Sequence, residues 1–520
     1  MQYFNLSYLL AFLPCVVLFY TITPKKHKWI ILLFFSYIFF FLISKKLIIY
    51  LILVTFLIYS FGLWIDKIDN DLSKEMLGNN NKKELKAISK KRKIRVVVLA
   101  TLLIAGILIV LKYTPFIGNN INYILHKLGS NYQLNVPVYL LPIGISFYTL
   151  EALSYIYDVY NKKIKADRNL GRLALYLAFF PSIMEGPISR YNDIAESLYS
   201  GNKIEYKNLT FGIQRILWGL MKKLIVADRL NACVSAIFDG YHNFDGGIIL
   251  IGAIFYTIQL YMDFSGTIDI VIGSGEIFGV KLPDNFRQPF FSRSISDFWT
   301  RWHITLGTWL RDYVFYPLSL SKKLRKLTSI TKKPILAGSI ALFVVWLING
   351  FWHGAGWNYI FFGMYHFVLI LTANIITPYI IKLCTKLKIN RDSILYKSIS
   401  IIKTTILVII GEMFFRANSL TAGLDMFKKI FTDFNINNIF NGSILKLHID
   451  VYDLFIILVV LIIVFVSSVL KEKNINIREL VARQNIIVRW FLYYSLILFV
   501  IIFGAYGVGY KPVNPIYANF

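Results

Sequence analysis

The sequence predicts an all-α, polytopic integral membrane protein. Of its 520 residues, 56% are hydrophobic and only 16% are charged, whereas about 25% of the residues of a typical soluble domain are charged. Apolar runs recur along the chain, each about long enough to cross roughly 30 Å of hydrocarbon as a helix. Roughly ten to thirteen spanning or re-entrant helices fit this pattern. Examples are residues 6–20, 29–43, 47–65, 96–111 and 451–470.

The basic residues gather between the apolar runs. The chain has 56 Lys and Arg against 29 Asp and Glu, a net charge of +27, but no basic aromatic platform or nucleic-acid-binding motif accompanies this charge, so we exclude nucleic acid as a partner. The positive-inside bias instead predicts that these segments face the cytoplasm and meet anionic lipid. They are residues 25–28, 82–95, 162–168 and 322–333.

Alternation of basic and weakly charged segments predicts the topology. Residues 66–95 form a long basic cytoplasmic loop, and both termini, including the tail 511–520, lie outside. The first apolar run lacks a preceding basic segment and a cleavage site, so we expect a retained helix. A single membrane domain spanning residues 1–520 is the simplest organisation. No internal repeat is visible, which lowers the case for a transporter without removing it.

The three cysteines are not predicted to have a functional role. Cys15, Cys233 and Cys384 are widely separated, so they indicate neither a disulfide framework nor a metal site. We therefore expect no bound metal.

A histidine in an apolar segment is the first candidate for chemistry. In LINGFWHGAGWNYIFFG, residues 347–363, glycines stand on both sides of Trp352 and His353. We expect them to loosen or break the helix on both sides and to let a substrate approach the backbone. A histidine satisfied by a carbonyl in a packed kink is the alternative, but an ionisable side chain in an apolar span is a functional candidate by default.

A second histidine stands in FWTRWHITLGTWLRDYVFYPL, residues 298–318. Helical spacing predicts an amphipathic helix with His303 on its apolar side. An interfacial helix with an aromatic belt explains the tryptophans but leaves His303 unexplained. The residues expected on that face are Trp299, Trp302, His303, Leu306 and Leu310.

Two carboxylates interrupt another apolar run. Asp263 and Asp269 lie in QLYMDFSGTIDIVIGSG, residues 259–275, and a carboxylate in the middle of a spanning helix costs roughly 2.5–3.5 kcal/mol. We expect each to face a cavity or a basic partner. A structural ion pair is favoured over catalysis, with candidate partners Arg287, Arg301 and Arg311.

Taken together, these motifs resemble the membrane-bound O-acyltransferase superfamily, in particular its bacterial branch that O-acetylates alginate and peptidoglycan. The resemblance runs in order from about residue 141 to residue 363. Besides the three segments above, it includes LPIGISFYTLEALSYIYDVY (141–160), FPSIMEGPISRY (180–191) and PDNFRQPF (283–290), with a weaker echo in GEMFFRA (411–417).

The resemblance implies an acyltransferase core over residues 141–363, built around a central funnel or tunnel. It implies transfer from a cytoplasmic acyl thioester such as acetyl-CoA to a hydroxyl reached from outside, with no tightly bound cofactor. His353 matches the family's motif histidine by position, and an imidazole with a pKa near 6.5 can accept the hydroxyl proton. His303 matches the second motif histidine and is the second catalytic candidate; whether it acts directly, orients a substrate or His353, hydrogen-bonds the carbonyl oxygen or only holds its helix in place is left open. A covalent acyl-enzyme is also left open. The expected supporting residues are Trp352, Asn349, Asp312, Arg311, Asp263 and Asp269.

The C-terminus resembles a short aromatic motif found at the ends of such transferases. PIYANF places Tyr517 at the motif tyrosine, where it would accept the acyl group or dock an extracytoplasmic partner; an exposed tail is the alternative. The branch implies a bacterial cytoplasmic membrane, a separate extracytoplasmic transferase and a surface polysaccharide as final acceptor. A transporter and a non-catalytic scaffold of a polysaccharide assembly are the rival functions.

Overall fold

The computed structural model describes residues 2–77, 81–332, 335–506 and 513–516, and these form two compact units. The first unit comprises residues 1–212 and 271–283, and the second comprises residues 213–270 and 284–520. The described residues are mostly helical and contain no strand; a single isolated bridge joins Phe286 and Trp302. The predicted all-helical, multi-pass fold is confirmed.

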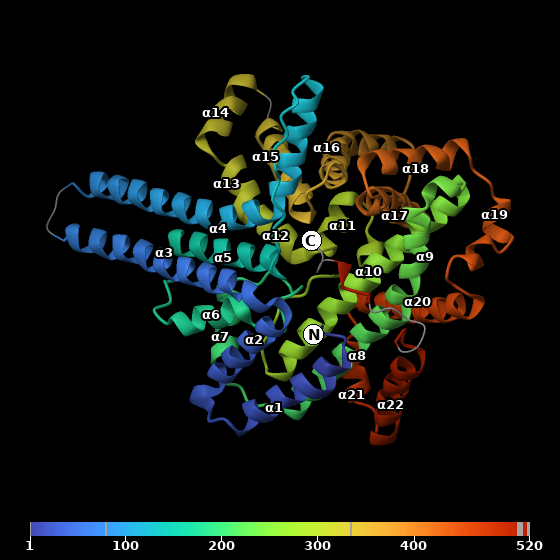
Figure 1. Ribbon diagram of the computed structural model, residues 1–520, viewed down its shortest axis with the longest axis horizontal. Helices are drawn as coiled ribbons and strands as arrows, with labels where there is room; N and C mark the ends of the chain where they lie inside the picture. Colours follow the sequence, from blue (N-terminus) through green and yellow to red (C-terminus); the bar gives the residue numbers. More distant parts are fainter. Residues whose placement is uncertain (1, 78–80, 333–334, 507–512, 517–520) are drawn as a thin grey trace. The chain divides into compact units, whose positions relative to one another are not determined.

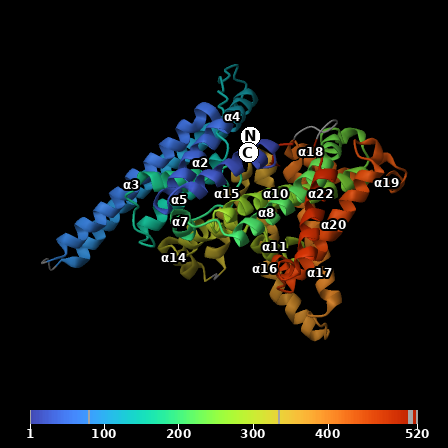
Figure 2. The same cartoon turned by 90° about the horizontal axis from the view of Figure 1, so that it is seen from below.

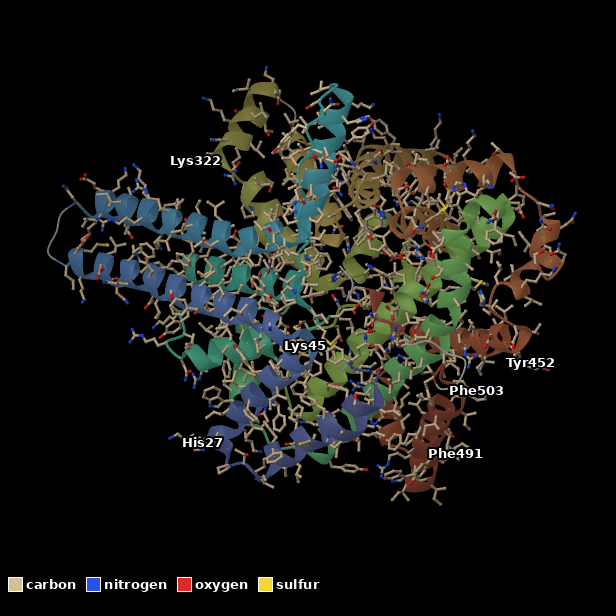
Figure 3. All side chains as sticks on the ribbon, in the orientation of Figure 1. His27, Lys45, Lys322, Tyr452, Phe491 and Phe503 are labelled. Atoms are coloured by element: carbon tan, nitrogen blue, oxygen red, sulfur yellow. The ribbon has the colours of Figure 1, made fainter. Side chains whose placement is uncertain are left out.

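Eight helical segments in the described residues are long and apolar enough to cross a membrane. Apolar side chains cover their outer faces: on α22, for example, Phe491 is 69% exposed and Phe503 37% exposed, and both are labelled in Figure 3. Such faces suit lipid contact. The eight segments are Lys25–Glu75, Lys82–Lys127, Gly246–Ile277, Leu336–His353, Trp357–Lys386, Ile394–Arg416, Val451–Glu472 and Ile486–Phe503.

The first unit is built on a long helical hairpin. Helices α3 (Ile48–Glu75) and α4 (Lys82–Lys127) run side by side (Figures 1 and 2). α5 packs against both, and Gly62 of α3 lets the ring of Tyr155 approach closely. The other helices of this unit are α1 (Leu13–Ile22), α2 (Lys28–Ser44), α5 (Ile145–Tyr160), α6 (Leu170–Ala178) and α7 (Tyr191–Tyr199).

The hairpin corrects one expectation. The segment 66–95 is not a loop, because α3 continues to Glu75 and α4 begins at Lys82. Its many lysines are good helix formers, and Lys93 forms a 3.0 Å ion pair with Asp69 across the hairpin. Polarity therefore marks where these helices leave the apolar zone, not where they end.

The second unit holds the remaining long helices. α15 (Leu336–His353) and α16 (Trp357–Lys386) are joined by three residues and pack closely, and α17 (Ile394–Arg416) lies against α16 (Figure 1). The unit further contains most of α8 (Tyr206–Leu220) and of α10 (Gly246–Ile277). Its other helices are α9 (Asp228–Asp239), α11 (Ile295–Arg301), α12 (Ile304–Leu310), α13 (Tyr316–Ser319), α14 (Lys322–Thr331), α18 (Leu420–Thr432), α19 (Asn437–Phe440), α20 (Val451–Glu472), α21 (Ile477–Ala482) and α22 (Ile486–Phe503).

Candidate functional site

His353 is the last residue of α15 and is only 2% exposed. The helix ends at Gly354, as expected, but runs unbroken through Asn349 and Gly350, so the predicted break on that side is wrong. Gly350 serves packing instead: a Cβ there would lie 2.6 Å from the carbonyl oxygen of Tyr359. The glycine thus brings α16 against α15 and fixes the position of His353.

Aromatic rings surround the His353 imidazole. Its centroid lies 5.0 Å from that of Trp352, 5.8 Å from that of Phe362 and 5.1 Å from that of Phe415. The three helices α15, α16 and α17 each contribute one of these rings. Rigid side chains with few rotamers therefore hold the imidazole in a dry environment, where electrostatic interactions are stronger than in water.

His303 lies between two helices and not within one, which corrects the predicted amphipathic helix. α11 ends at Arg301, α12 begins at Ile304, and His303 adopts a left-handed conformation with φ of +46°. Its Nδ1 lies 3.3 Å from Oδ1 of Asn285, an oxygen that also accepts hydrogen bonds from the backbone N–H and the hydroxyl of Thr305. The segment 283–290 thereby fixes the second histidine.

The structure brings both predicted histidines to one indole. The centroid of Trp352 lies 5.4 Å from that of His303 and 5.0 Å from that of His353. Burial lowers the pKa of His303 to about 3, because desolvation disfavours the charged imidazolium. His303 is therefore neutral at physiological pH and suits a hydrogen-bonding role better than that of a cationic acid.

A small cavity beside His353 contains two ionisable residues that the sequence interpretation missed. The cavity has a volume of about 10 Å³, close to the least that holds one water molecule. Glu412 of α17 lines it, is 4% exposed, and has an Oε2 without a hydrogen-bond partner among the described residues. His366 of α16 also lines it and accepts a 3.2 Å hydrogen bond from Trp299 Nε1.

A much larger pocket of about 1280 Å³ opens next to this cavity. Phe415 lines both spaces, and its ring packs against the His353 imidazole. The pocket is lined by polar and charged groups as well as apolar ones, including Asp228, Arg229, Gln259, Gly356, Tyr359, Arg416, His448, Asp453 and Ile516.

Buried ion pairs hold the two intramembrane carboxylates. Asp263 lies 2.6 Å from Lys223, which also lies 2.7 Å from Asp228. Asp269 lies 2.6 Å from Lys222 and 2.9 Å from Arg215. The expectation of basic partners is met, but the predicted partners are wrong: Arg301 pairs with Asp297 and Glu472, Arg311 pairs with Asp312, and the structure gives Arg287 no ion pair among the described residues. Lys222 and Lys223 were not predicted as partners because they are far from the two aspartates in the sequence. Both lysines lie in the π-helical segment Met221–Ala227.

The Lys223 cluster also binds the end of the described chain. Asp263 Oδ2 accepts a 2.7 Å hydrogen bond from the backbone N–H of Ile516, and Lys223 Nζ donates one of 3.3 Å to the carbonyl of Val513. Residues 513–516 thus form part of the wall of the large pocket. Tyr517 lies outside the described residues.

The structure also places the other predicted supporting residues. Arg311 Nε donates a 3.0 Å hydrogen bond to Asp312, its neighbour in the chain, at the start of a π-helical segment. Asn349 is 4% exposed in α15. No group of three or more His, Cys, Asp or Glu side chains that could hold a metal ion occurs among the described residues.

Comparison with known proteins shows which family this sequence resembles. The sequence model of MBOAT, the membrane-bound O-acyltransferase family, matches residues 160–410, a range that contains both His303 and His353. Probable alginate O-acetylase of Pseudomonas aeruginosa is 35% identical over 321 residues, which cover 62% of this chain and 57% of that protein.

Two relatives with other names show similar identity. Peptidoglycan O-acetyltransferase of Helicobacter pylori is 32% identical over 281 residues, 49% of this chain and 50% of the relative. Teichoic acid D-alanyltransferase of Bacillus subtilis is 33% identical over 238 residues, 45% of this chain and 58% of the relative. The chain thus spans about half to three fifths of the length of these curated relatives.

Proposed function

We propose that this chain, whose residues 160–410 match the membrane-bound O-acyltransferase family, transfers an acyl group from a thioester to a hydroxyl group, with His353 as general base. One observation carries this proposal: His353 is buried beside the large pocket, with Phe415 lining both the pocket and the cavity of the imidazole. A hydroxyl that enters the pocket and displaces this ring reaches the imidazole.

The chemistry needs one base and a dry site. The acceptor hydroxyl gives its proton to the His353 imidazole as its oxygen bonds to the acyl carbon. The carbon–sulfur bond then breaks, and the departing thiolate takes the proton back. His303, neutral and fixed by Asn285, supports the indole that contacts His353. General-base catalysis of this kind typically contributes about 10²- to 10⁴-fold in rate.

The acceptor is proposed to enter from outside the cell. The pocket lies at the ends of the second unit's helices that carry Arg416 and Asp453. The opposite ends of α17 and α20 lead into the basic segments 382–391 and 471–489, which the positive-inside bias assigns to the cytoplasm. We propose that the protein lies in the bacterial cytoplasmic membrane with both termini outside.

The relatives' names indicate the class of acceptor. Two are O-acetylating enzymes of alginate and peptidoglycan, and a third is a D-alanyltransferase of teichoic acid. We propose acetyl from acetyl-CoA as the acyl group and a cell-surface polysaccharide as the final acceptor, reached through a separate extracytoplasmic transferase. Tyr517 is proposed as the relay or docking residue for that partner.

Turnover of a radiolabelled donor distinguishes this enzyme from its rivals. Purified protein in liposomes should turn over radiolabelled acetyl-CoA, and His353→Ala should lower the rate of this turnover about 10²- to 10⁴-fold. His27→Ala is a matched control, because this histidine is exposed in the first unit (Figure 3). A transporter or a scaffold would leave the thioester intact in every variant.

A further inference from the structure

A groove on the α3/α4 hairpin is separate from the site described above. It has a volume of about 720 Å³ and lies wholly in the first unit. Its residues recur every three or four positions on each helix, so one stripe of α3 faces one stripe of α4. The stripes are Ser60, Leu63, Trp64, Lys67, Ile68 and Asp71 on α3, and Arg92, Arg95, Val96 and Leu99 on α4.

Another face of the hairpin is already occupied. There, Asp69 pairs with Lys93 at 3.0 Å and with Lys162 at 3.1 Å, and Gly62 packs against Tyr155 of α5. The groove residues are offset from these positions around each helix. The two stripes are therefore not the surface that joins the hairpin to α5.

Basic groups without partners line the polar half of the groove. Lys67, Arg92 and Arg95 are exposed, and none of them has a hydrogen bond or ion pair to another described residue. With Asp71 as the one acidic residue lining the groove, the lining carries a net positive charge. The neighbouring Lys93, by contrast, is buried and paired.

The groove crosses the edge of the apolar zone. On α3 the apolar sequence gives way to Asp66 and Lys67, and on α4 the basic sequence gives way to Val96. Leu63 and Leu99 lie on the apolar side of this boundary, while the arginines lie on the polar side. Trp64, 49% exposed, stands at the boundary, where tryptophans favour lipid headgroups.

We propose that this groove binds an anionic phospholipid. The phosphate lies between Arg92 and Arg95, because guanidinium groups form paired hydrogen bonds with phosphate oxygens. An acyl chain follows Leu63 and Leu99 into the apolar zone, and Trp64 borders the glycerol region. The stretch from residue 60 to residue 71 measures roughly 16 Å at 1.5 Å per residue, enough for a headgroup and the first part of a chain. This site does not depend on the proposed acyl transfer.

Native mass spectrometry of the full chain in detergent tests the proposal. The probes are phosphatidylglycerol, phosphatidylcholine and inorganic phosphate. Phosphatidylglycerol should bind in preference to phosphatidylcholine, and Arg92→Gln with Arg95→Gln should weaken its binding on the order of tenfold or more, since each basic residue near anionic lipid contributes about fivefold. Lys86→Gln with Lys90→Gln removes the same charge from exposed positions of α4 outside the groove and should change binding less than twofold.

A photoactivatable phosphatidylglycerol gives a second test that needs no variant. Its label should appear in peptides containing residues 63–68 and 92–99. Equal binding of the two lipids, equal losses in the two double variants, or label confined to other helices would overturn the proposal. Inorganic phosphate that binds the groove while phosphatidylglycerol does not would overturn it as well, by making the groove a free-phosphate site.

Discussion

The rings of Phe415 and His353 pack edge to face, with 5.1 Å between their centroids and 82° between their planes. Phe415 is 3% exposed and His353 is 2% exposed, so the imidazole is covered in this structure. Phe415 also lines the large pocket, so the residue that packs against the imidazole borders the space through which we propose that an acceptor comes.

Replacing Phe415 by Leu should increase hydrolysis of the acyl donor relative to transfer. The smaller side chain opens the His353 cavity to the pocket, so water competes with the intended hydroxyl for the acyl group. We expect a higher ratio of acetyl-CoA hydrolysis to polysaccharide acetylation, measured with labelled donor, at a cost of roughly 1 kcal/mol in folding stability. Phe414→Leu, on the same helix but not lining the pocket, is the control; an equal rise in hydrolysis there would contradict this role.

Glu412→Gln should change the pH dependence of transfer. The substitution keeps the shape of the side chain and removes its ionisable proton from the cavity that it shares with His353. We expect a loss on the order of tenfold in kcat and a displaced pH–rate profile, whereas Met413→Leu on the same helix should leave both unchanged. A folded Glu412→Gln enzyme with the wild-type profile would show that the carboxyl exchanges no proton with the site.

His303 should not produce the acidic limb of that profile. Its pKa falls from about 6.5 in an unfolded chain to about 3 on burial. A depressed histidine pKa makes its stabilising contribution complete above about pH 6.5 and lost progressively as the pH falls toward 3. His303→Gln should therefore leave the midpoint of the rate profile in place while flattening the loss of stability between pH 6.5 and 4.5, measured by denaturant unfolding. A shifted midpoint in His303→Gln would contradict this assignment.

Lys223→Met should be strongly destabilising. Lys223 lies within 2.7 Å of both Asp263 and Asp228 in a buried setting, and removing one partner of such a pair typically costs about 3–5 kcal/mol. Adding Asp263→Asn to Lys223→Met should recover part of this loss, because it removes a buried charge left without its partner. Thermal melting of both variants measures the effect; a double variant less stable than the single one would exclude the pairing as the cause.

Local patterns in the sequence predicted the helical membrane fold, and they singled out His303 and His353, which the structure brings to one indole. Apolar run length indicates spanning helices directly, and the glycines beside His353 marked its segment as unusual. The same pattern misjudged Gly350, because close packing against Tyr359 and a helix break demand the same small residue. Only the position of α16 in the structure shows that Gly350 serves packing and does not break the helix.

Contacts between segments that are far apart in the chain could not be predicted from local sequence patterns. The basic partners of Asp263 and Asp269 are more than 35 residues earlier in the chain, and Glu412 lines the His353 cavity from another helix. A usable signal existed for each: Lys222, Lys223 and Glu412 are ionisable residues in apolar surroundings, which are costly there and therefore informative. Phe415 gave no chemical signal, since a phenylalanine in an apolar helix is ordinary, and only its place in GEMFFRA marked the segment.

Chemical rescue of His353→Ala tests the central claim most directly. The substitution removes the imidazole and leaves a space of its size among the rings of Trp352, Phe362 and Phe415. The rate of label transfer from acetyl-CoA to a polysaccharide hydroxyl should fall by about 10²- to 10⁴-fold and rise again when free imidazole is added. A folded His353→Ala protein that transfers at the wild-type rate without imidazole would contradict His353 as the base.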